Sequence, residues 1–219
     1  MTTLPTAKDL KAQIEAGVAG AAVTVIPNAS PSAQLSLLLD HAHAVAVALF
    51  LRDRPDLRLD FCTLVTGVDW LDTETTEKIK VKKMVAGPDG VEAEQEVEET
   101  RKTKVPGYLE AVYHLFSMEK KHVPPSLPVV LRLRTANRTD QTHVPSLTPV
   151  WRSCEFQERE AFDLYGIVFD GHPDLRRILM WDGFQDFPMR KDYVPPDDDS
   201  LAPLPFASLQ RASTKETRP

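Results

Sequence analysis

Residues 158–193 read EREAFDLYGIVFDGHPDLRRILMWDGFQDFPMRKDY, and this stretch is the most informative part of the chain. It carries eight acidic and five basic residues, interleaved with more than ten large apolar or aromatic residues. A solvated loop does not need so many apolar groups, and a core strand would not tolerate so many charges. The composition indicates a segment buried partly in its own domain and partly against another protein, because arginine and aromatic residues are favoured at the centres of interfaces.

Local signals predict an ordered backbone within this segment. Thr148 and Pro149 open a helical pattern that we expect to run, with a break, to Tyr165, and Gly166 is a natural stop. Residues four apart on this helix carry opposite charges, which predicts ion pairs along one face. The pairs in question are Glu155 with Arg159 and Arg159 with Asp163.

The sequence after this helix predicts a turn and a short second helix. Pro173 fixes one backbone angle, and Asp174 can accept a hydrogen bond from the nearby backbone, so 172–174 has the features of a turn. Asp174 could then cap a short helix through Leu179. Arg176 and Arg177 would project in different directions, one inward to a carboxylate and one outward to a partner.

Upstream of residue 148, periodicity predicts alternating helices and strands. Residues 128–134 alternate in the manner of a sheet with one wet face: Val129, Leu131 and Leu133 point one way and the arginines the other. The predicted helices cover 8–15 and about 32–52, and the predicted strands cover 21–26, 57–68, 108–118 and 128–134. The fold class is therefore α+β: a mixed sheet packed against helices, followed by a helix/loop motif segment and an extended C-terminal tail.

A charged insert interrupts the strand pattern at about 72–104. Four lysines precede the turn-like Gly-Pro-Asp-Gly of residues 87–90, and five glutamates follow it. A basic arm facing an acidic arm is typical of an exposed hairpin with cross-strand charge pairs. We expect an α/β core domain over 1–150 that carries this hairpin, a motif segment over 151–193 that faces partner subunits, and an extended proline- and acid-rich tail over 194–219.

Bulk properties argue against several functions. The chain has 219 residues and a formal net charge of −6, which gives no reason to expect nucleic-acid binding. Its two cysteines, Cys62 and Cys154, form no CxxC pair, so we expect neither a zinc site nor an iron–sulfur cluster, and their scarcity suggests a reducing compartment. The N-terminus lacks the pattern of a secretory signal, and the most apolar stretch, 35–51, contains Asp40, His41 and His43 and does not predict a membrane span.

Catalytic motifs are absent from the sequence, which contains no GxGxxG, P-loop, HExxH or GxSxG. His41 and His43 would point to different faces of a helix and do not suggest a metal site. One acid–base interpretation remains open, in which five groups line the site of a free-standing hydrolase. These are Glu158, Glu160, Asp163, His172 and Asp174. Paired ion networks explain the same charges equally well.

The order of residues in this region resembles the hallmark stretch of the C subunit of proton-pumping NADH:quinone oxidoreductase, the 30 kDa subunit family of respiratory complex I. The resemblance covers about 57–193 without the charged insert. It rests on Glu158-Arg159-Glu160, Phe162-Asp163, Gly166-Ile167, the run GHPDLRRIL of 171–179, and Pro188 with Arg190-Lys191-Asp192-Tyr193. Departures occur at Phe156, Asp186 and Val194, where the family usually has Trp, Gly and Pro.

The resemblance implies a structural subunit of the peripheral arm with no active site, cofactor or metal of its own. FMN and iron–sulfur clusters would lie in partner subunits, and NADH and quinone would be substrates of the whole complex, which couples electron transfer to proton translocation. The chief partner would be the quinone-side D subunit, with the B and I subunits nearby, on the cytoplasmic side of the bacterial inner membrane. An equivalent subunit of a ferredoxin-type dehydrogenase or a membrane-bound hydrogenase is the alternative. The expected partner-facing residues are Glu158, Arg159, Glu160, Asp163, His172, Asp174, Arg176, Arg177, Arg190, Lys191 and Asp192.

Overall fold

A five-stranded mixed sheet forms the centre of the computed structural model, which describes residues 5–28, 34–86, 92–120 and 128–195. The strand order is β1-β2-β7-β6-β3, with β2 and β7 parallel and the other neighbours antiparallel. These strands are β1 (Val23–Ile26), β2 (Ser36–Leu39), β3 (Phe61–Trp70), β6 (Tyr108–Phe116) and β7 (Val129–Arg134). The predicted α+β class with a mixed sheet is confirmed.

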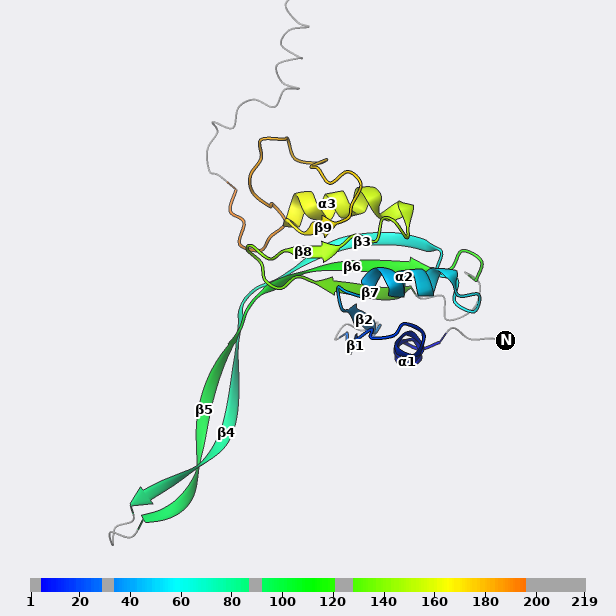
Figure 1. The fold of residues 1–219 in the computed structure, drawn as a ribbon. Coiled ribbons are helices and arrows are strands. Elements are labelled where there is room, and N and C mark those ends of the chain that lie inside the picture. Colours follow the sequence, from blue (N-terminus) through cyan, green and yellow to red (C-terminus); the bar gives the residue numbers. More distant parts are fainter. Residues whose placement is uncertain (1–4, 29–33, 87–91, 121–127, 196–219) are drawn as a thin grey trace, which may run out of the picture.

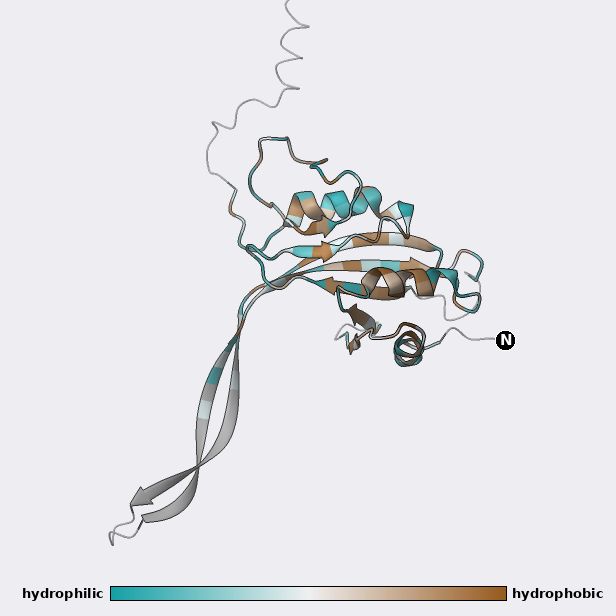
Figure 2. Cartoon of the chain, viewed as in Figure 1, coloured by the Kyte–Doolittle hydropathy of each residue, from teal (hydrophilic) through white to brown (hydrophobic). Residues whose placement is uncertain are grey.

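Two helices from the N-terminal half pack against this sheet (Figure 1). Helix α1 (Ala7–Gly17) begins at a capping box, in which Thr6 and Asp9 each bond the other's backbone N–H. Helix α2 (Ala44–Asp53) buries Val47 and Leu51 in the core. Figure 2 shows that α2 is largely hydrophobic, whereas α3 (Glu155–Tyr165) is mainly hydrophilic.

The predicted helix over 32–52 is wrong in its first half. Ser36–Leu39 is a strand between β1 and β7, and α2 begins only at Ala44. A central strand buried on both faces is a continuous apolar run, which periodicity cannot distinguish from a buried helix. His41 and His43 therefore lie in the turn between the two elements, where Asp40 accepts hydrogen bonds from the backbone N–H and from Nδ1 of His43.

Alternation along β7 sorts its side chains as predicted. Leu131 and Leu133 are fully buried in the core, whereas Arg132 and Arg134 lie on the other face and both pair with the buried Glu110. The short strands β8 (His143–Pro145) and β9 (Val168–Asp170) pair in parallel and were not predicted from the sequence. The two strands flank the 3₁₀ turn Arg152–Cys154 and helix α3 in the sequence. The 3₁₀ turn is the break expected in the helical pattern that ends at Tyr165.

A long two-stranded ribbon projects away from the body of the chain (Figure 1). It consists of β4 (Thr73–Ala86) and β5 (Glu92–Val105), paired antiparallel from Thr73↔Val105 to Ala86↔Glu92. This is the segment in which the charge pattern predicts a hairpin. The tip, 87–91, and the greater part of the predicted tail, 196–219, lie outside the described residues.

Helix α3 reaches the sheet through a glycine. A Cβ on Gly67 of β3 would lie 2.4 Å from Cδ2 of Tyr165, so only glycine lets the ring of Tyr165 pack this closely on the strand. The helix ends at Gly166, whose φ of 76° belongs to the left-handed region that favours glycine at a helix end. From there the chain turns back over α3 through β9 and the loop to residue 195.

Candidate functional site

Helix α3 carries two buried carboxylates that hold the surrounding segments together, and Glu158 is the first. Its side chain is fully buried and accepts hydrogen bonds from the hydroxyls of Tyr113 (3.0 Å), Ser146 (2.5 Å) and Thr148 (3.0 Å) and from the backbone N–H of Leu147 (2.8 Å). Burial raises the pKa of Glu158, and these hydrogen bonds offset only part of that effect. The carboxylate thus ties α3 to β6 and to the loop after β8.

Asp163 is the second buried carboxylate, and it organises the loop after β9. One oxygen accepts backbone hydrogen bonds from Ile178 (3.0 Å), Leu179 (2.7 Å) and Met180 (2.8 Å), and the other accepts from Nη1 of Arg177 (2.7 Å). Burial alone would raise the pKa of Asp163, but the four donors together lower it below its ordinary value. Three consecutive N–H groups converging on one carboxylate oxygen fix the backbone of 178–180.

These contacts replace the helix predicted for 174–179, where the chain is an irregular turn. Arg177 points inward to Asp163 and Arg176 is exposed, so the prediction that the two arginines diverge is confirmed. The guanidinium of Arg177 also lies over the rings of Phe184 (5.6 Å) and Phe187 (5.4 Å), within the range of a cation–π contact.

Arg159 makes different partners from those that helical spacing predicts. Its guanidinium lies 3.5 Å from Asp174, and its Nε donates to the carbonyl oxygen of Arg176 (3.1 Å). Glu155 pairs instead with Arg152, and Asp163 pairs with Arg177. The predicted i, i+4 pairs on α3 are therefore wrong, because Arg152 of the preceding 3₁₀ turn and partners from the returning loop take their place.

His172 acts as a backbone connector at the turn. Its Nδ1 accepts from the N–H of Asp174 (3.0 Å), so Nε2 carries the proton and donates to the carbonyl oxygen of Glu155 (2.9 Å). Both ring nitrogens are engaged in this way. The five groups considered for a hydrolase are not assembled into one acid–base site, since Glu158 and Asp163 face separate sets of partners and Glu160 is exposed.

A third buried carboxylate fastens the end of the motif segment to the sheet. Asp69 of β3 forms a two-point ion pair with Arg138 (2.6 and 2.8 Å) and accepts from the backbone N–H of Lys191 (2.8 Å). Arg138 also pairs with Asp192 (2.9 Å), while Nε of Arg190 donates to the carbonyl oxygen of Tyr165 (2.7 Å). Sequence reasoning missed Arg138 and the role of Asp69, although an aspartate at a core-facing strand position is a usable signal.

Four large apolar side chains of α3 and of the loop after β9 are exposed, and we call this set the motif surface. Phe156 is 61% exposed, and Leu179, Trp181 and Met189 are each just over half exposed. Exposed apolar side chains on a helix and an ion-paired loop that also carry exposed charges are typical of a protein-binding surface. The exposed charged residues of the same segment include Glu160, Arg176, Lys191 and Asp192.

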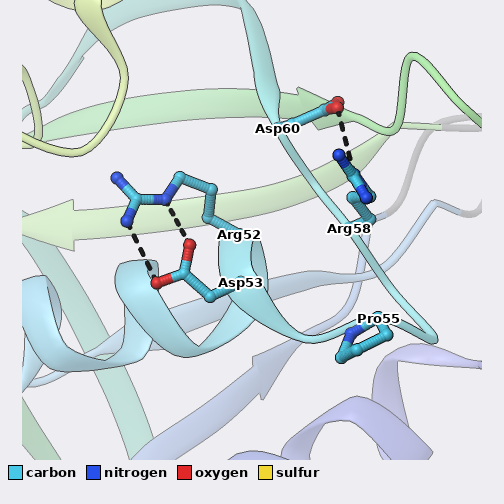
Figure 3. Close-up of a pocket in the computed structure, with 5 residues that line it drawn as sticks. All are labelled: Arg52, Asp53, Pro55, Arg58 and Asp60. Carbon is cyan, nitrogen blue, oxygen red and sulfur yellow. Dashed lines mark hydrogen bonds and ion pairs between the residues drawn. The ribbon is translucent and has the colours of Figure 1, made fainter.

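The hollow at the end of α2 has a different character (Figure 3). It has a volume of about 400 Å³ and is lined by Arg52, Asp53, Pro55, Arg58 and Asp60. Each arginine in it already has an aspartate partner, Arg52 with Asp53 at 2.6 Å and Arg58 with Asp60 at 3.8 Å. The pairing leaves little net charge to attract an anionic ligand. Among the described residues there is also no group of three metal-binding side chains, and no helix is long and apolar enough to cross a membrane.

The family model described as "Respiratory-chain NADH dehydrogenase, 30 Kd subunit" matches residues 37–199. The chain belongs to this family. The match begins in β2 and includes every residue expected to face a partner. It also includes the ribbon, so β4 and β5 lie within the family domain and do not flank it.

Curated members of the 30 Kd subunit family are similar over much of the chain. The C subunit of the NADH-quinone oxidoreductase of Caulobacter sp. is 35% identical over 193 residues, covering 88% of this chain and 71% of that protein. The protein of the same name from Saccharopolyspora erythraea is 35% identical over 160 residues, covering 73% of this chain and 49% of that protein. The chain thus spans about half the length of some of the relatives it matches.

A solved structure shows a similar fold. A chain of the membrane-bound sulfane sulfur reductase, an archaeal respiratory membrane complex, aligns with a TM-score of 0.51 at 17% identity. The alignment covers 96% of this chain and 93% of that one. At this identity the likeness concerns the fold alone.

Proposed function

We propose that the chain is a non-catalytic structural subunit of the peripheral arm of an NADH:quinone oxidoreductase, and that it binds partner subunits through the motif surface. Family membership supports the type of complex. The observation that carries the binding role is the Asp163 cluster, in which one carboxylate fixes Arg177 and three backbone N–H groups beneath the exposed Leu179. A loop already rigid before binding loses less conformational entropy when a partner docks.

In this proposal the buried and exposed residues of the motif have separate tasks. Glu158, Arg159 and Asp163 support the surface from within, while Glu160, Arg176, Lys191 and Asp192 border the apolar side chains that meet the partner. The partner we propose is the quinone-side D subunit, with the B and I subunits nearby, on the cytoplasmic side of the inner membrane. FMN and iron–sulfur clusters would be held by other subunits, and this chain would contribute to electron transfer and proton translocation only by assembly.

The test is the pair of variants Arg177→Ala and Arg177→Lys, examined in the native membrane. Removing one member of a buried ion pair strands the other, at a cost of about 3–5 kcal/mol, whereas lysine keeps the charge but loses the planar two-point geometry. We expect Arg177→Ala to reduce the amount of intact complex on a native gel, and Arg177→Lys to reduce it less. The isolated chain should stay folded, since its sheet lies elsewhere.

The same preparation separates the alternatives. Quinone reductase activity per intact complex should be unchanged in both variants. Normal abundance with nearly inactive copies would assign Arg177 to catalysis and contradict the proposal. Mass spectrometry of the co-purified subunits distinguishes an NADH-dependent complex from a ferredoxin-type dehydrogenase or a hydrogenase. Turnover of a substrate by the purified chain alone would favour a free-standing hydrolase.

A further inference from the structure

All three described α-helices pack on one face of the five-stranded sheet. Tyr113, Leu131 and Leu133 share that face by register, and they join residues of α1, α2 and α3 in the hydrophobic core. Val112 and Val130 alternate with them along the strands, so they lie on the opposite face, and neither belongs to that core. We call this second face the open face, because none of the described helices packs on it.

Large apolar side chains are exposed along one strand of the open face. Phe61, Leu64 and Trp70 of β3 are 39%, 46% and 41% exposed, and their register places all three on this face. Strand β3 is an edge of the sheet, so these side chains follow one border of the open face. Exposed apolar groups that collect in this way mark a surface suited to contact with another protein.

Beside this border, two arginines of β7 share one buried glutamate of β6. Oε2 of Glu110 accepts from Nη1 of Arg132 (2.7 Å) and from Nε1 of Trp70 (2.9 Å). Oε1 accepts from Nε (3.2 Å) and Nη2 (2.9 Å) of Arg134. Nε of Arg132 also donates to the hydroxyl of Ser36 (2.8 Å). These contacts hold both guanidinium groups in place on the open face.

The set of Glu110, Arg132 and Arg134, which we call the arginine cluster, keeps unused donors and an excess of positive charge. No described residue accepts a hydrogen bond from Nη2 of Arg132 or from Nη1 of Arg134, and the two side chains are 20% and 34% exposed. Burial, with the charge of Arg132, lowers the pKa of the neighbouring His114, so this histidine is neutral at pH 7. Two guanidinium groups against one carboxylate therefore leave one positive charge without a counter-charge.

This excess charge specifies what can cover the open face. A protein that packs on Leu64 and Trp70 would take the guanidinium groups of Arg132 and Arg134 out of water. Charged donors removed from water need charged acceptors, and a carboxylate can accept from two adjacent guanidinium groups in strong, charge-assisted hydrogen bonds. The matching partner surface is therefore an aspartate or glutamate set among apolar side chains.

Other occupants fit less well. The chain as a whole carries a formal charge of −6, which opposes binding to nucleic acid or to an anionic membrane. A second copy of this chain, docked through the same face about a twofold axis, would bring one arginine cluster toward the other. A different polypeptide that supplies a carboxylate avoids both repulsions.

We propose that the open face of the sheet is a second docking site, at which Arg132 and Arg134 together bind an aspartate or glutamate side chain of another subunit in the same assembly. Leu64 and Trp70 contact the apolar side chains beside that carboxylate. The inference rests on the proposed function, because it takes the assembly to be the one bound through the motif surface. It uses a different face of the sheet and different residues.

The first measurement compares Arg134→Gln with a matched control, Arg54→Gln, in the complex from native membranes. Arg54 also forms a two-point pair with a single carboxylate, that of Asp56 (2.6 and 2.7 Å), has a similar exposure of 31%, and lies over an aromatic ring, as Arg134 does. It lies at the end of α2, which packs on the covered face. In Arg134→Gln the buried Glu110 keeps Arg132 and Trp70 as donors, so the isolated variant chains should have similar melting temperatures.

We expect Arg134→Gln to raise the rate at which the chain leaves the purified complex by about thirtyfold, and Arg54→Gln to leave that rate unchanged. Thirtyfold is the lower end of the effect of truncating one partner of a buried interfacial charge pair. Dilution of the complex, followed by quantitative mass spectrometry of the subunits that remain, gives the rate.

The second measurement identifies the occupant and keeps the charge of the site. Arg134→Lys places a primary amine on the open face, and a carbodiimide joins an amine to a carboxylate in contact with it while taking up the water released. We expect a crosslinked peptide between position 134 and an aspartate or glutamate of another subunit. The same treatment of Arg54→Lys should join position 54 only to acidic residues of this chain.

Several results would overturn the inference. Equal release rates for Arg134→Gln and Arg54→Gln would mean that the arginine cluster makes no contact in the complex. A crosslink from position 134 to Glu110 alone, or to a second copy of this chain, would show that no carboxylate of another subunit reaches it. Loss of complex with Arg177→Ala but not with Arg134→Gln would remove the second docking site and leave the proposed function standing. If the wild-type chain co-purified with no other subunit, the proposed function itself would fail.

Discussion

Glu158 and Asp163 lie five residues apart on one helix, are both fully buried, and have pKa values displaced in opposite directions. The difference comes from their donors. Asp163 receives a guanidinium and three backbone N–H groups, which favour the ionised form, while Glu158 receives three hydroxyls and one N–H, which do not fully offset burial. The direction of the pKa shift of a buried carboxylate thus depends on the number and kind of its hydrogen-bond donors as well as on burial.

Replacing Glu158 should therefore lower the free energy of unfolding, and the loss should grow with the number of buried donors left without an acceptor. Glu158→Ala leaves four buried donors unsatisfied, at about 1–3 kcal/mol each before relaxation, so we expect the free energy of unfolding to fall by at least about 3 kcal/mol. Glu158→Gln keeps an acceptor and should cost about 1 kcal/mol. Urea denaturation of the purified chain measures both.

The exposed neighbour Glu160 supplies the control. Glu160→Ala should change the free energy of unfolding by no more than about 0.5 kcal/mol, as is usual for surface substitutions. Equal losses at 158 and 160 would mean that the Glu158 cluster does not stabilise the fold.

At the scale of elements, sequence patterns predicted best where local chemistry decides the structure. The stop predicted at Gly166 is where α3 ends, although α3 itself begins at Glu155 and not at Thr148, where the helical pattern was predicted to open, and β6 and β7 form where strands were predicted. Prediction failed where a residue far away in the sequence determines the local structure. Residues 36–39 became a strand because β7 pairs with them, and 174–179 stayed irregular because Asp163 takes the N–H groups that a helix would use.

The candidate site was predicted in part for the same reason. Composition indicated that 158–193 has two kinds of neighbour, and the divergence of Arg176 and Arg177 was predicted from a short helix after Asp174 that the structure does not contain. The partners of the buried carboxylates Glu158 and Asp69 could not be predicted from residue spacing, because Tyr113, Ser146 and Arg138 lie in other parts of the chain. Contacts between residues far apart in the chain leave no periodic signal.

The ribbon should be dispensable for folding of the isolated chain. Thr73 and Val105 are cross-strand partners, so a short linker can replace 74–103 without moving β3 or β6. Exposed ion pairs contribute about 0–1 kcal/mol each. We expect the melting temperature of the deletion variant to fall by no more than about 4 °C.

Thermal denaturation followed by circular dichroism is the measurement for this deletion. Global unfolding of the variant would mean that the ribbon belongs to the core.

At the scale of the whole molecule, two carboxylates fasten the C-terminal segment, one end to helix α3 and the other to the sheet. Asp163 holds the backbone of 178–180, and Asp69, on β3, holds Lys191 more than a hundred positions further along the chain. Burial would raise the pKa of Asp69, but Arg138 and the N–H of Lys191 lower it below its ordinary value. The segment between these two anchors is the one that presents Trp181 and Met189.

Acid should consequently release this segment before the sheet unfolds. A carboxyl with a lowered folded pKa stabilises the fold above its unfolded pKa, about 3.9 for aspartate, and loses that contribution as the pH falls through the folded value. Glu158 has the opposite sign: its raised pKa makes ionisation costly, so its own contribution improves as the pH falls toward about 4.3. We expect hydrogen-exchange protection factors, corrected for intrinsic rates, to stay constant from neutral pH to about pH 4 at the amides of Ile178, Leu179 and Met180, and then to collapse. The core amides of β6 should remain protected at that pH. In Asp163→Asn, which cannot titrate, the three amides should show no such step, whereas an unchanged step in that variant would assign the acid release to other carboxylates.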